Sequence, residues 1–598
     1  MEKENAKEIL KICMSKGFLL DKEMLGYFSE LDKDSTEEII DKFRSLDINE
    51  RVITRALFGK NFEKIKSILI NGKSQIVIEK FFFSMGYSVS EVYPSGVGGN
   101  RGGVGARSNN FAEEDLDSEE GKKRKGHPVK ILSSIHFPPR KIGVKDFVNH
   151  FRARYGILKK IIEAKNLEGL TAIRKIGNDR GSYTIIASIL NKRITKNKNI
   201  VLDVEDMTGN IGVLINHNKK EVFDLAKDLL VDEIVALNVS GNREMLFANN
   251  VIFPDAHLVE KKHSKNEGSI AFISDIHIGS SLFLEKNFLK FIKWLNGEEG
   301  DEKQRGLARN VKYLFITGDT VDGVGVFPGQ DKILDMKDMA LQYKRLAELL
   351  KLIRRDVEII LCPGQHDAVW VGEPQPVIGE DWAGALYKME NMTLVSNPAL
   401  IEIEDGFRVL MYHGASMHGI VEEIADLRLN FKHNSPTRIV KEMLKRRHLA
   451  PMHGASDYIP CEGIDPMAIE IIPDILSTGD LHRAEVSSYN NILLVSSSCW
   501  QSITPFEEKV GNNPDPCKVP LFNMKTREIK ILDFSENEEE IVKIASEDCK
   551  ETGNSVVCSV VPSVIPSVPL VSSVSGVNNF SNQEVVLQQN NPGEGVKL

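Results

Sequence analysis

Five short apolar segments between residues 270 and 482 each run into an aspartate, a histidine or both, and this repetition constrains the fold more than any other feature. The motifs are Asp275-x-His277, Gly318-Asp319, Gln365-His366-Asp367, His413-Gly414 and Asp480-x-His482. Apolar runs of this length, alternating with stretches of helical periodicity, predict an α/β layered domain. Because open α/β sheets gather their functional loops at strand ends, we expect the five motifs to meet in one site. A single motif of this kind would more often be a structural corner between strand and loop.

The side chains of the five motifs suit a pair of divalent cations. Carboxylate and amide oxygens mixed with imidazole nitrogens are ligands for Mn²⁺, Mg²⁺, Fe and Zn²⁺. The predicted ligands are Asp275, His277 and His482 for one cation, Gln365, His413 and Asp480 for the other, and Asp319 as the bridge. Two cations about 3.5–4 Å apart can hold a phosphate diester and activate water.

Two further residues of the third motif are predicted to be catalytic. His366 stands beside a predicted ligand and has no ligand role itself. We expect it to protonate the leaving oxygen or to stabilise the developing charge. Asp367 is expected to orient His366, with capping of the following turn as the alternative.

A basic stretch between the fourth and fifth motifs is predicted to bind nucleic acid. The candidate residues are Arg438, Lys441, Lys445, Arg446 and Arg447. The whole chain has a net charge of −9, so any surface for a phosphate backbone must be local. A solvated helix face is the alternative reading of the same residues.

The chain divides into five predicted regions. They are a helical module (1–75), a flexible charged linker (76–149), an OB-like barrel (150–257), the α/β domain (265–536) and a disordered tail (537–598). The glycine-rich, charge-segregated linker cannot bury enough apolar surface to order itself. Five β-like runs, with one helical run before the fourth, predict the barrel. Both single-strand binding and subunit docking remain open as roles for the barrel.

Two features bear on the compartment. The seven cysteines are scattered without a C-x-x-C pair, which favours reduced thiols over a disulfide framework. No apolar stretch approaches the ~18 residues of a membrane span. We therefore expect a cytoplasmic protein that uses no membrane.

The five motifs resemble those of the calcineurin-like metallophosphoesterases, whose pattern is D-x-H, G-D, G-N-H-[DE], H and G-H-x-H. The resemblance covers about residues 265–500 and implies a two-sheet sandwich flanked by helices, with two divalent metal ions. Gln365 replaces the usual asparagine, and Asp480 replaces the first histidine of the last motif. Both changes lie in the second metal's shell, and they favour Mn²⁺ or Mg²⁺ over Fe or Zn²⁺.

A closer resemblance is to the small subunits of archaeal family-D DNA polymerases. It is carried by residues 318–330 (GDTVDGVGVFPGQ), 363–368 (PGQHDA), 446–451 (RRHLAP) and 498–506 (SCWQSITPF). The resemblance implies a 3′→5′ exonuclease that degrades single-stranded DNA, proofreads primer ends and supports synthesis by a large catalytic subunit in a heterodimer. DNA is then a further partner, a sliding clamp a candidate one, and the location is the archaeal cytoplasm at the nucleoid.

Two other readings stay open at this point. The accessory B-subunits of eukaryotic replicative polymerases resemble this fold with the ligands lost, so a weak or inactive scaffold is one alternative. A stand-alone repair nuclease or phosphoesterase keeps the chemistry without the polymerase. It leaves the barrel and the N-terminal helices unexplained.

Overall fold

The computed structural model describes residues 2–28, 33–45, 51–54, 57–58, 127–135, 141–461, 463–510, 512–535, 543–545 and 557–558. The chain forms two compact units, Met1–Lys123 and Arg124–Leu598. The glycine-rich and charged part of the predicted linker lies outside the described residues, as does most of the predicted tail. Within the described residues, no helix is both long enough and apolar enough to cross a membrane.

The first unit contains a small group of helices; their assignment to one module over residues 1–75 stays a prediction, since residues 59–75 lie outside the described residues. These are α1 (Glu2–Ser15), α2 (Lys22–Phe28) and α3 (Lys33–Ser45), accompanied by β1 (Leu19–Leu20) and β2 (Val52–Ile53). The two short strands pair in parallel. Ile9 and Cys13 are buried, four residues apart on one face of α1, and Ile39 of α3 is buried as well.

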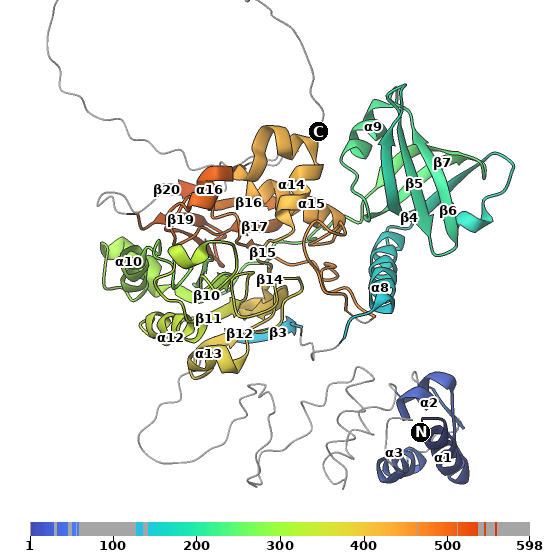
Figure 1. Cartoon of the computed structure of the whole chain (residues 1–598), viewed down its shortest axis with the longest axis horizontal. Helices are drawn as coiled ribbons and strands as arrows, with labels where there is room; N and C mark the ends of the chain where they lie inside the picture. The colour runs from blue at the N-terminus through green and yellow to red at the C-terminus, as the bar shows by residue number, and fades with distance from the viewer. Residues whose placement is uncertain are drawn as a thin grey trace, which may run out of the picture. The chain divides into compact units, whose positions relative to one another are not determined.

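After strand β3 (Val129–Ser133), the second unit continues with a helix and a closed barrel (Figure 1). They comprise α8 (Val144–Glu163), η1 (Ile173–Lys175), β4 (Gly181–Ile194), β5 (Ile200–Asp206), β6 (Gly209–Ile215), α9 (Lys220–Lys227), β7 (Ile234–Gly241) and β8 (Leu246–Ile252). The strand order around the barrel is β4-β5-β6-β8-β7. Inward residues such as Ile185, Leu202 and Val213 fill its interior. The five predicted strands are present; the assignment as an OB fold stays a prediction.

Two seven-stranded sheets form the centre of the α/β region. The first has the order β12-β11-β10-β9-β18-β19-β20 and the second β21-β16-β17-β15-β14-β13-β3. The first comprises β9 (Ser269–Ile273), β10 (Val311–Thr317), β11 (Glu358–Cys362), β12 (Met392–Leu394), β18 (Lys518–Asn523), β19 (Ile529–Asp533) and β20 (Lys543–Ala545). The second comprises β3 (Val129–Ser133), β13 (Ala399–Ile403), β14 (Arg408–Met411), β15 (Ile475–Thr478), β16 (Glu485–Tyr489), β17 (Ile492–Ser496) and β21 (Val557–Cys558).

The alternation of side chains along each strand explains why the sheets are sandwiched. In β9, Ile270 and Phe272 pack in a core shared with Val409 and Val495 of the second sheet. The alternate residues Ala271 and Ile273 pack in a second core with helices on the outer face. This confirms the predicted arrangement of mixed α/β sheets with helices on both outer faces.

The helices that cover the two sheets divide into two sets. Beside the first sheet lie α10 (Glu285–Leu295), α11 (Glu302–Arg309), α12 (Met339–Leu350) and α13 (Glu380–Tyr387). Beside the second lie α14 (Met417–Glu423), η4 (Leu427–Phe431) and α15 (Pro436–Arg446). The remaining short helices are η2 (Gln330–Lys332), η3 (Glu404–Gly406), η5 (Lys432–Asn434) and α16 (Pro505–Val510).

Three strands correct the predicted boundaries. Strand β3 lies within the predicted linker, yet it pairs antiparallel with β13 at the edge of the second sheet. Strands β20 and β21 lie within the predicted tail and pair with β19 and β16. An open sheet edge offers unpaired backbone groups to any nearby chain, and the local sequence of these short segments does not reveal that partner.

A buried charge cluster joins α8 to the loop that follows α15. We call it the Asp465 cluster: Asp465, Arg154, His448 and His150, all nearly inaccessible to solvent. Oδ2 of Asp465 lies 2.7 Å from Nε of Arg154, 2.8 Å from Nε2 of His448 and 3.4 Å from Nε2 of His150. The cluster therefore ties the helix before the barrel to the α/β region.

Candidate metal centre

The five motifs meet at one edge of the sandwich because the strands before them run in parallel. Strands β9, β10 and β11 pair in parallel in the first sheet, as do β14 and β15 in the second. The carboxyl ends of the two sets adjoin: Oγ1 of Thr317 lies 2.9 Å from Oγ of Ser477. All seven predicted ligands consequently lie in loops at this edge, as does His366.

The backbone at the site is strained at five of the seven predicted ligands. Asp275, His277, Asp319, Asp480 and His482 have φ angles of 50°, 55°, 48°, 67° and 53°. Non-glycine residues seldom adopt this left-handed region, and each instance costs on the order of 1–3 kcal/mol. Gly318 also has a positive φ of 82°, and a Cβ there would collide with the ring of His413. The fold thus accepts strain to bring these side chains together.

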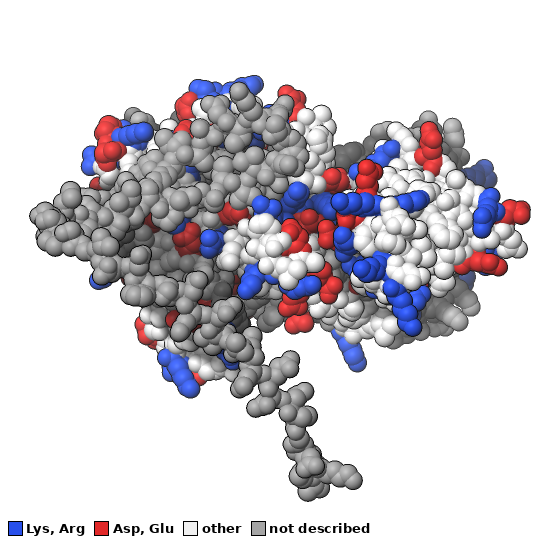
Figure 2. Space-filling model, turned by 90° about the horizontal axis from the view of Figure 1, so that it is seen from above, with Lys and Arg blue, Asp and Glu red and all other residues white. Residues whose placement is uncertain are grey.

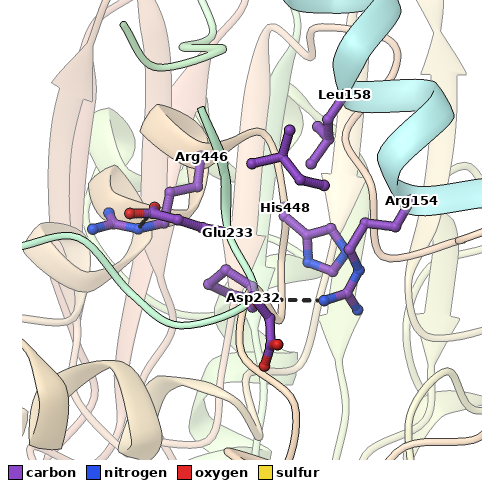
Figure 3. A pocket seen from close by; sticks show the side chains of 8 residues that line it. Arg154, Leu158, Asp232, Glu233, Arg446 and His448 are labelled. Atoms are coloured by element: carbon purple, nitrogen blue, oxygen red, sulfur yellow. Dashed lines mark hydrogen bonds and ion pairs between the residues drawn. The ribbon is translucent and has the colours of Figure 1, made fainter. Parts of the chain in front are cut away.

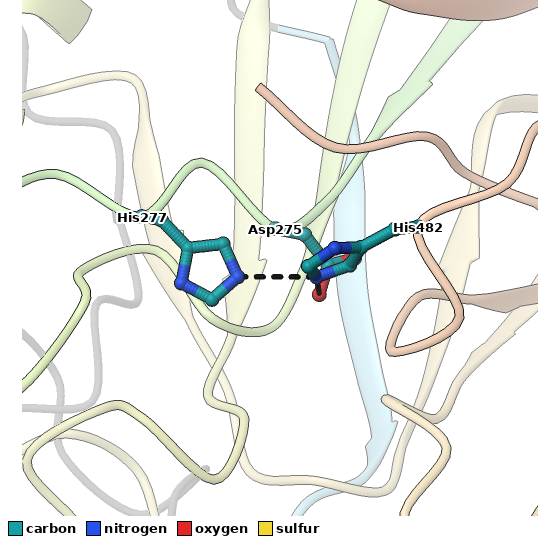
Figure 4. Close-up of side chains that lie close together, drawn as sticks. All are labelled: Asp275, His277 and His482. Carbon is teal, nitrogen blue, oxygen red and sulfur yellow. Dashed lines mark hydrogen bonds and ion pairs between the residues drawn. The ribbon is translucent and has the colours of Figure 1, made fainter. Parts of the chain in front are cut away.

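Three residues form the first group of donor atoms (Figure 4). Nε2 of His277 and Nε2 of His482 are 3.2 Å apart, and Nε2 of His482 lies 3.4 Å from Oδ1 of Asp275. These are the three residues predicted for the first cation. Two ligands each about 2.1 Å from one cation lie roughly 3 Å apart, so the spacing fits a shared cation.

Asp319 occupies the middle of the site. Its Oδ2 lies 3.2 Å from Nε2 of His413 and 3.9 Å from Nε2 of His366. It belongs to two of the three groups of potential ligands, one with Asp275 and His413 and one with His277 and His366. Burial alone would raise the pKa of Asp319, but His413 and His366 hold it well below its usual value. This central carboxylate has the position expected of a bridging ligand.

Four imidazoles are oriented in the same way. Each has an oxygen beside its Nδ1 atom. Nδ1 of His277 lies 3.2 Å from Oδ1 of Asp322, and Nδ1 of His366 lies 2.7 Å from the Asp322 carbonyl oxygen. Nδ1 of His413 lies 2.9 Å from the Thr317 carbonyl oxygen, and Nδ1 of His482 lies 2.8 Å from Oε1 of Glu507. An oxygen beside Nδ1 favours a proton on that nitrogen and leaves the Nε2 lone pair free for a cation. All four Nε2 atoms face the site.

Unsatisfied polar atoms support a cationic occupant. Within the described residues, Oε1 of Gln365 and Nε2 of His413 are buried and make no hydrogen bond. Nε2 of Gln365 donates to Oδ1 of Asp480 at 3.3 Å, which brings the two unusual ligands side by side. Buried polar groups without partners are rare and require an explanation such as an ion. The donor set therefore fits two divalent cations.

Asp367 does not have the expected role of orienting His366. Its carboxylate accepts hydrogen bonds from the backbone of Gly364 at 2.8 Å and from the hydroxyls of Tyr343 and Thr320. Burial raises the pKa of Asp367, and the Asp319 charge adds to this shift. Its partners also differ from the following turn that the alternative named: Asp367 ties the preceding loop, which carries Gln365 and His366, to Thr320 and Tyr343. The prediction failed because the partner of an acid beside a histidine depends on loops distant in sequence.

Three of the residues predicted to bind nucleic acid contact other parts of the protein. Nε of Arg446 is buried 2.7 Å from Oε2 of Glu233, at a narrow pocket between α15 and the barrel (Figure 3). Nε of Arg447 donates to the Ile469 carbonyl at 2.6 Å, and Nζ of Lys445 lies 4.3 Å from the ring centre of Phe253. Assigning Arg446 and Arg447 to DNA was therefore wrong: these cations fasten the barrel and the following loop to α15.

The remaining two basic residues are half-buried. Arg438 lies over the ring of Phe431 at 4.0 Å, and Lys441 lies 5.3 Å from the ring centre of Tyr489. On the described surface drawn in Figure 2, lysines and arginines are interspersed with acidic residues. The assignment of Arg438, Lys441 and Lys445 to nucleic acid stays a prediction, since these side chains contact aromatic rings but remain partly exposed.

Three residues at the site were missed. Asp322 contacts both His277 and His366, and Glu507 holds His482. His418 of α14 lies 3.1 Å from Asp480. Asp322 stands three positions after Asp319 and His418 five positions after His413, and this proximity was the available signal. Glu507 reaches the site through tertiary structure alone.

Comparison with known proteins identifies relatives. Residues 270–487 match the family model that describes the B-subunits of DNA polymerases alpha and epsilon. The DNA polymerase II small subunit of Methanothermobacter thermautotrophicus is 35% identical over 425 residues, which cover 71% of this chain and 84% of the relative. The protein of the same name from Archaeoglobus fulgidus is 36% identical over 393 residues, which cover 66% of this chain and 78% of the relative.

Among solved structures, zinc-complexed Vps29 from Entamoeba histolytica matches with a TM-score of 0.24 and 14% identity. The match covers 48% of this chain and 98% of that one. The sequence relatives, and not this structure, carry the family assignment.

Proposed function

Because the chain belongs to the family of archaeal DNA polymerase II small subunits, we propose that it is the small subunit of a replicative polymerase and carries a metal-dependent 3′→5′ exonuclease. In this proposal it pairs with a large catalytic subunit, removes nucleotides from single-stranded or mismatched 3′ ends, and supports synthesis by its partner. Two divalent metal ions, with Mn²⁺ and Mg²⁺ favoured, are its cofactors.

The donor atoms suit hydrolysis of a phosphate diester. When bound, a pair of divalent cations supplies stabilisation of the negative charge that develops on the phosphate. Asp275, His277 and His482 would hold one cation, and Gln365, His413 and Asp480 the other, with Asp319 shared. The strained backbone keeps these groups in place before substrate binds, which lowers the reorganisation required during the reaction.

His366 is suited to move the proton. Its Nδ1 is held by the Asp322 carbonyl, so Nε2 is the atom that faces Asp319 and the site. One fifth of its side chain remains exposed, in contrast to the fully buried His413, so a substrate can reach it. We assign the imidazolium form of His366, with Nδ1–H donating to the Asp322 carbonyl, to give its Nε2 proton to the 3′ oxygen as it departs, which leaves the ring neutral.

The single observation that carries this proposal is the convergence of all seven predicted ligands, with buried unsatisfied atoms among them. A scaffold subunit would have no need of this arrangement. In a scaffold subunit, the free energy spent on backbone strain at five ligands and on orienting four imidazoles would serve no function.

The test uses the full chain co-purified with its large subunit. Degradation of a 5′-labelled single strand in Mn²⁺ is measured for the wild type and for Asp319→Ala and His366→Ala. We expect a loss of about 10³-fold or more for Asp319→Ala, and about 10²–10⁴-fold for His366→Ala. His217→Ala, an exposed barrel residue, is the matched control and should retain full activity.

Co-elution with the large subunit should be unchanged in all variants. Wild-type rates in Asp319→Ala would refute the assigned chemistry. A wild-type complex that degrades no DNA would instead support the scaffold reading.

A further inference from the structure

His418 lies beside the metal centre although it belongs to none of the five motifs. It is the second residue of α14, which begins shortly after His413 at the end of β14. Nε2 of His418 lies 3.1 Å from Oδ2 of Asp480. The other oxygen, Oδ1, lies 3.9 Å from Nε2 of His413, so one carboxylate adjoins both imidazoles.

The orientation of His418 repeats that of the four histidines described above. Its Nδ1 lies 3.1 Å from Nε2 of His433, and the two rings have centroids 4.7 Å apart. Nδ1 is thus occupied by a neighbour, and Nε2 faces an aspartate of the site. Five imidazoles therefore present the same atom to one group of three carboxylates, Asp275, Asp319 and Asp480.

The chemistry of the second cation's shell suggests why a fifth imidazole is there. That shell contains Gln365 and Asp480, which supply oxygens, and His413, which supplies one nitrogen. Imidazole nitrogens suit Fe and Zn²⁺, whereas carboxylate and carbonyl oxygens suit Mg²⁺, Ca²⁺ and Mn²⁺. An additional imidazole would restore a second nitrogen to the shell.

We propose that His418 is a ligand of the second cation, through Nε2, with His433 holding its ring in place. The separation of 3.1 Å from Asp480 matches the roughly 3 Å expected between two ligands of one cation. The side chain is 54% exposed, so it lies at the mouth of the centre, where it closes the shell on the solvent side. This inference rests on the two-cation centre of the proposed function.

The experiment measures metal binding instead of activity. Full-length wild type, His418→Ala and the control His217→Ala are stripped with chelator and titrated with Mn²⁺ by calorimetry. Wild type and His217→Ala should bind two equivalents. In His418→Ala the weaker step should lose about tenfold or more in affinity while the stronger step is unchanged.

A spectroscopic readout separates ligation from a simple ion pair. The same proteins are loaded with Co²⁺, whose visible absorption depends on the number of nitrogen ligands. Loss of an imidazole should shift the bands of the second site in His418→Ala. Asp480→Asn keeps His418, so it should alter the spectrum without reproducing the His418→Ala spectrum.

The outcomes are distinct. The role of His418 would be overturned if both Mn²⁺-binding steps were unchanged in His418→Ala. It would also be overturned if one binding step were weaker but the Co²⁺ spectrum were unchanged. Either outcome would leave the two-cation centre intact. A wild-type chain that binds fewer than two equivalents would overturn the two-cation centre, and this inference with it. Circular dichroism of the metal-free variant confirms that its fold is retained.

Discussion

The Asp465 cluster and the metal centre are built from the same residue types, yet they differ in the source of their positive charge. In the Asp465 cluster, one carboxylate faces a guanidinium and two imidazoles, and Arg154 supplies a full charge from within the chain. In the metal centre, three carboxylates are present, and their ion pairs within the described residues involve histidines alone.

The difference shows what makes a cluster of aspartate and histidine structural or functional. A buried carboxylate must be compensated, and Arg154 does so permanently for Asp465. Three carboxylates facing neutral or partly charged imidazoles still need positive charge. Divalent cations can provide it, and with them the chemistry. The two clusters also differ in their backbone: five ligands of the centre have a positive φ, whereas within the described residues no member of the Asp465 cluster does.

The largest expected effect that would test this contrast comes from removing the charge of Asp465. Asp465→Asn leaves Arg154 buried without its carboxylate, so the free energy of unfolding should fall by about 3–5 kcal/mol. Urea unfolding at pH 7 measures this change, with the exposed Asp457→Asn as a control that should be neutral. Mn²⁺ binding by the folded variant should stay within about twofold of the wild type; loss of it would show that the two clusters are not independent.

The second effect concerns pH and has opposite signs in the two clusters. Burial first, and the Arg154 charge second, lower the pKa of His448 from 6.5 to about 4. Between these values the unfolded chain binds more protons, so stability falls as pH decreases from about 6.5 to 4. Burial lowers the pKa of His413, but the charges of Asp319, Asp275 and Asp480 outweigh burial and raise this pKa well above 6.5. In the metal-free chain, the stability that protonated His413 contributes is therefore complete below pH 6.5 and is lost at high pH.

His448→Gln separates the two contributions, because the amide can still donate to Asp465 but does not titrate. The difference in unfolding free energy between wild type and variant should shift by up to about 3 kcal/mol from pH 7 to pH 4, with the wild type losing more. Unfolding in urea at several pH values, with chelator present, measures it. A constant difference across this range would refute the assignment of a buried neutral His448.

The smallest effect, counted for each cation separately, is the stabilisation of the centre by its metal ions. Mn²⁺ at one hundred times its dissociation constant should raise the free energy of unfolding by about 2.7 kcal/mol per site. Thermal unfolding with Mn²⁺ and with chelator reports this as a shift in Tm. Asp275→Asn should reduce the shift strongly, whereas Asp457→Asn should keep it. An equal Mn²⁺ response in Asp275→Asn would place the binding elsewhere.

Some of the site could be predicted because its signals are local. Each ligand follows an apolar run within a few residues, and parallel strands bring such ends to one edge. The role of Asp367 and the partners of Arg446 were mispredicted for a common reason. A carboxylate beside His366, or a guanidinium in a basic run, has many possible partners. The partners of Asp367 are Gly364 and Tyr343, and the partner of Arg446 is Glu233.

The sequence by itself determined the α/β layering and the donor atoms of the centre, because apolar runs, helical periodicity and strand-end motifs act over short distances; the two-sheet sandwich was implied by the family resemblance. Tertiary structure decided which nitrogen of each histidine faces the site, since Asp322, Thr317 and Glu507 come from other loops. It also brought His418 beside Asp480. The physical reason is that hydrogen-bond partners and charge compensation depend on contacts between segments far apart in the chain, and no local pattern records them.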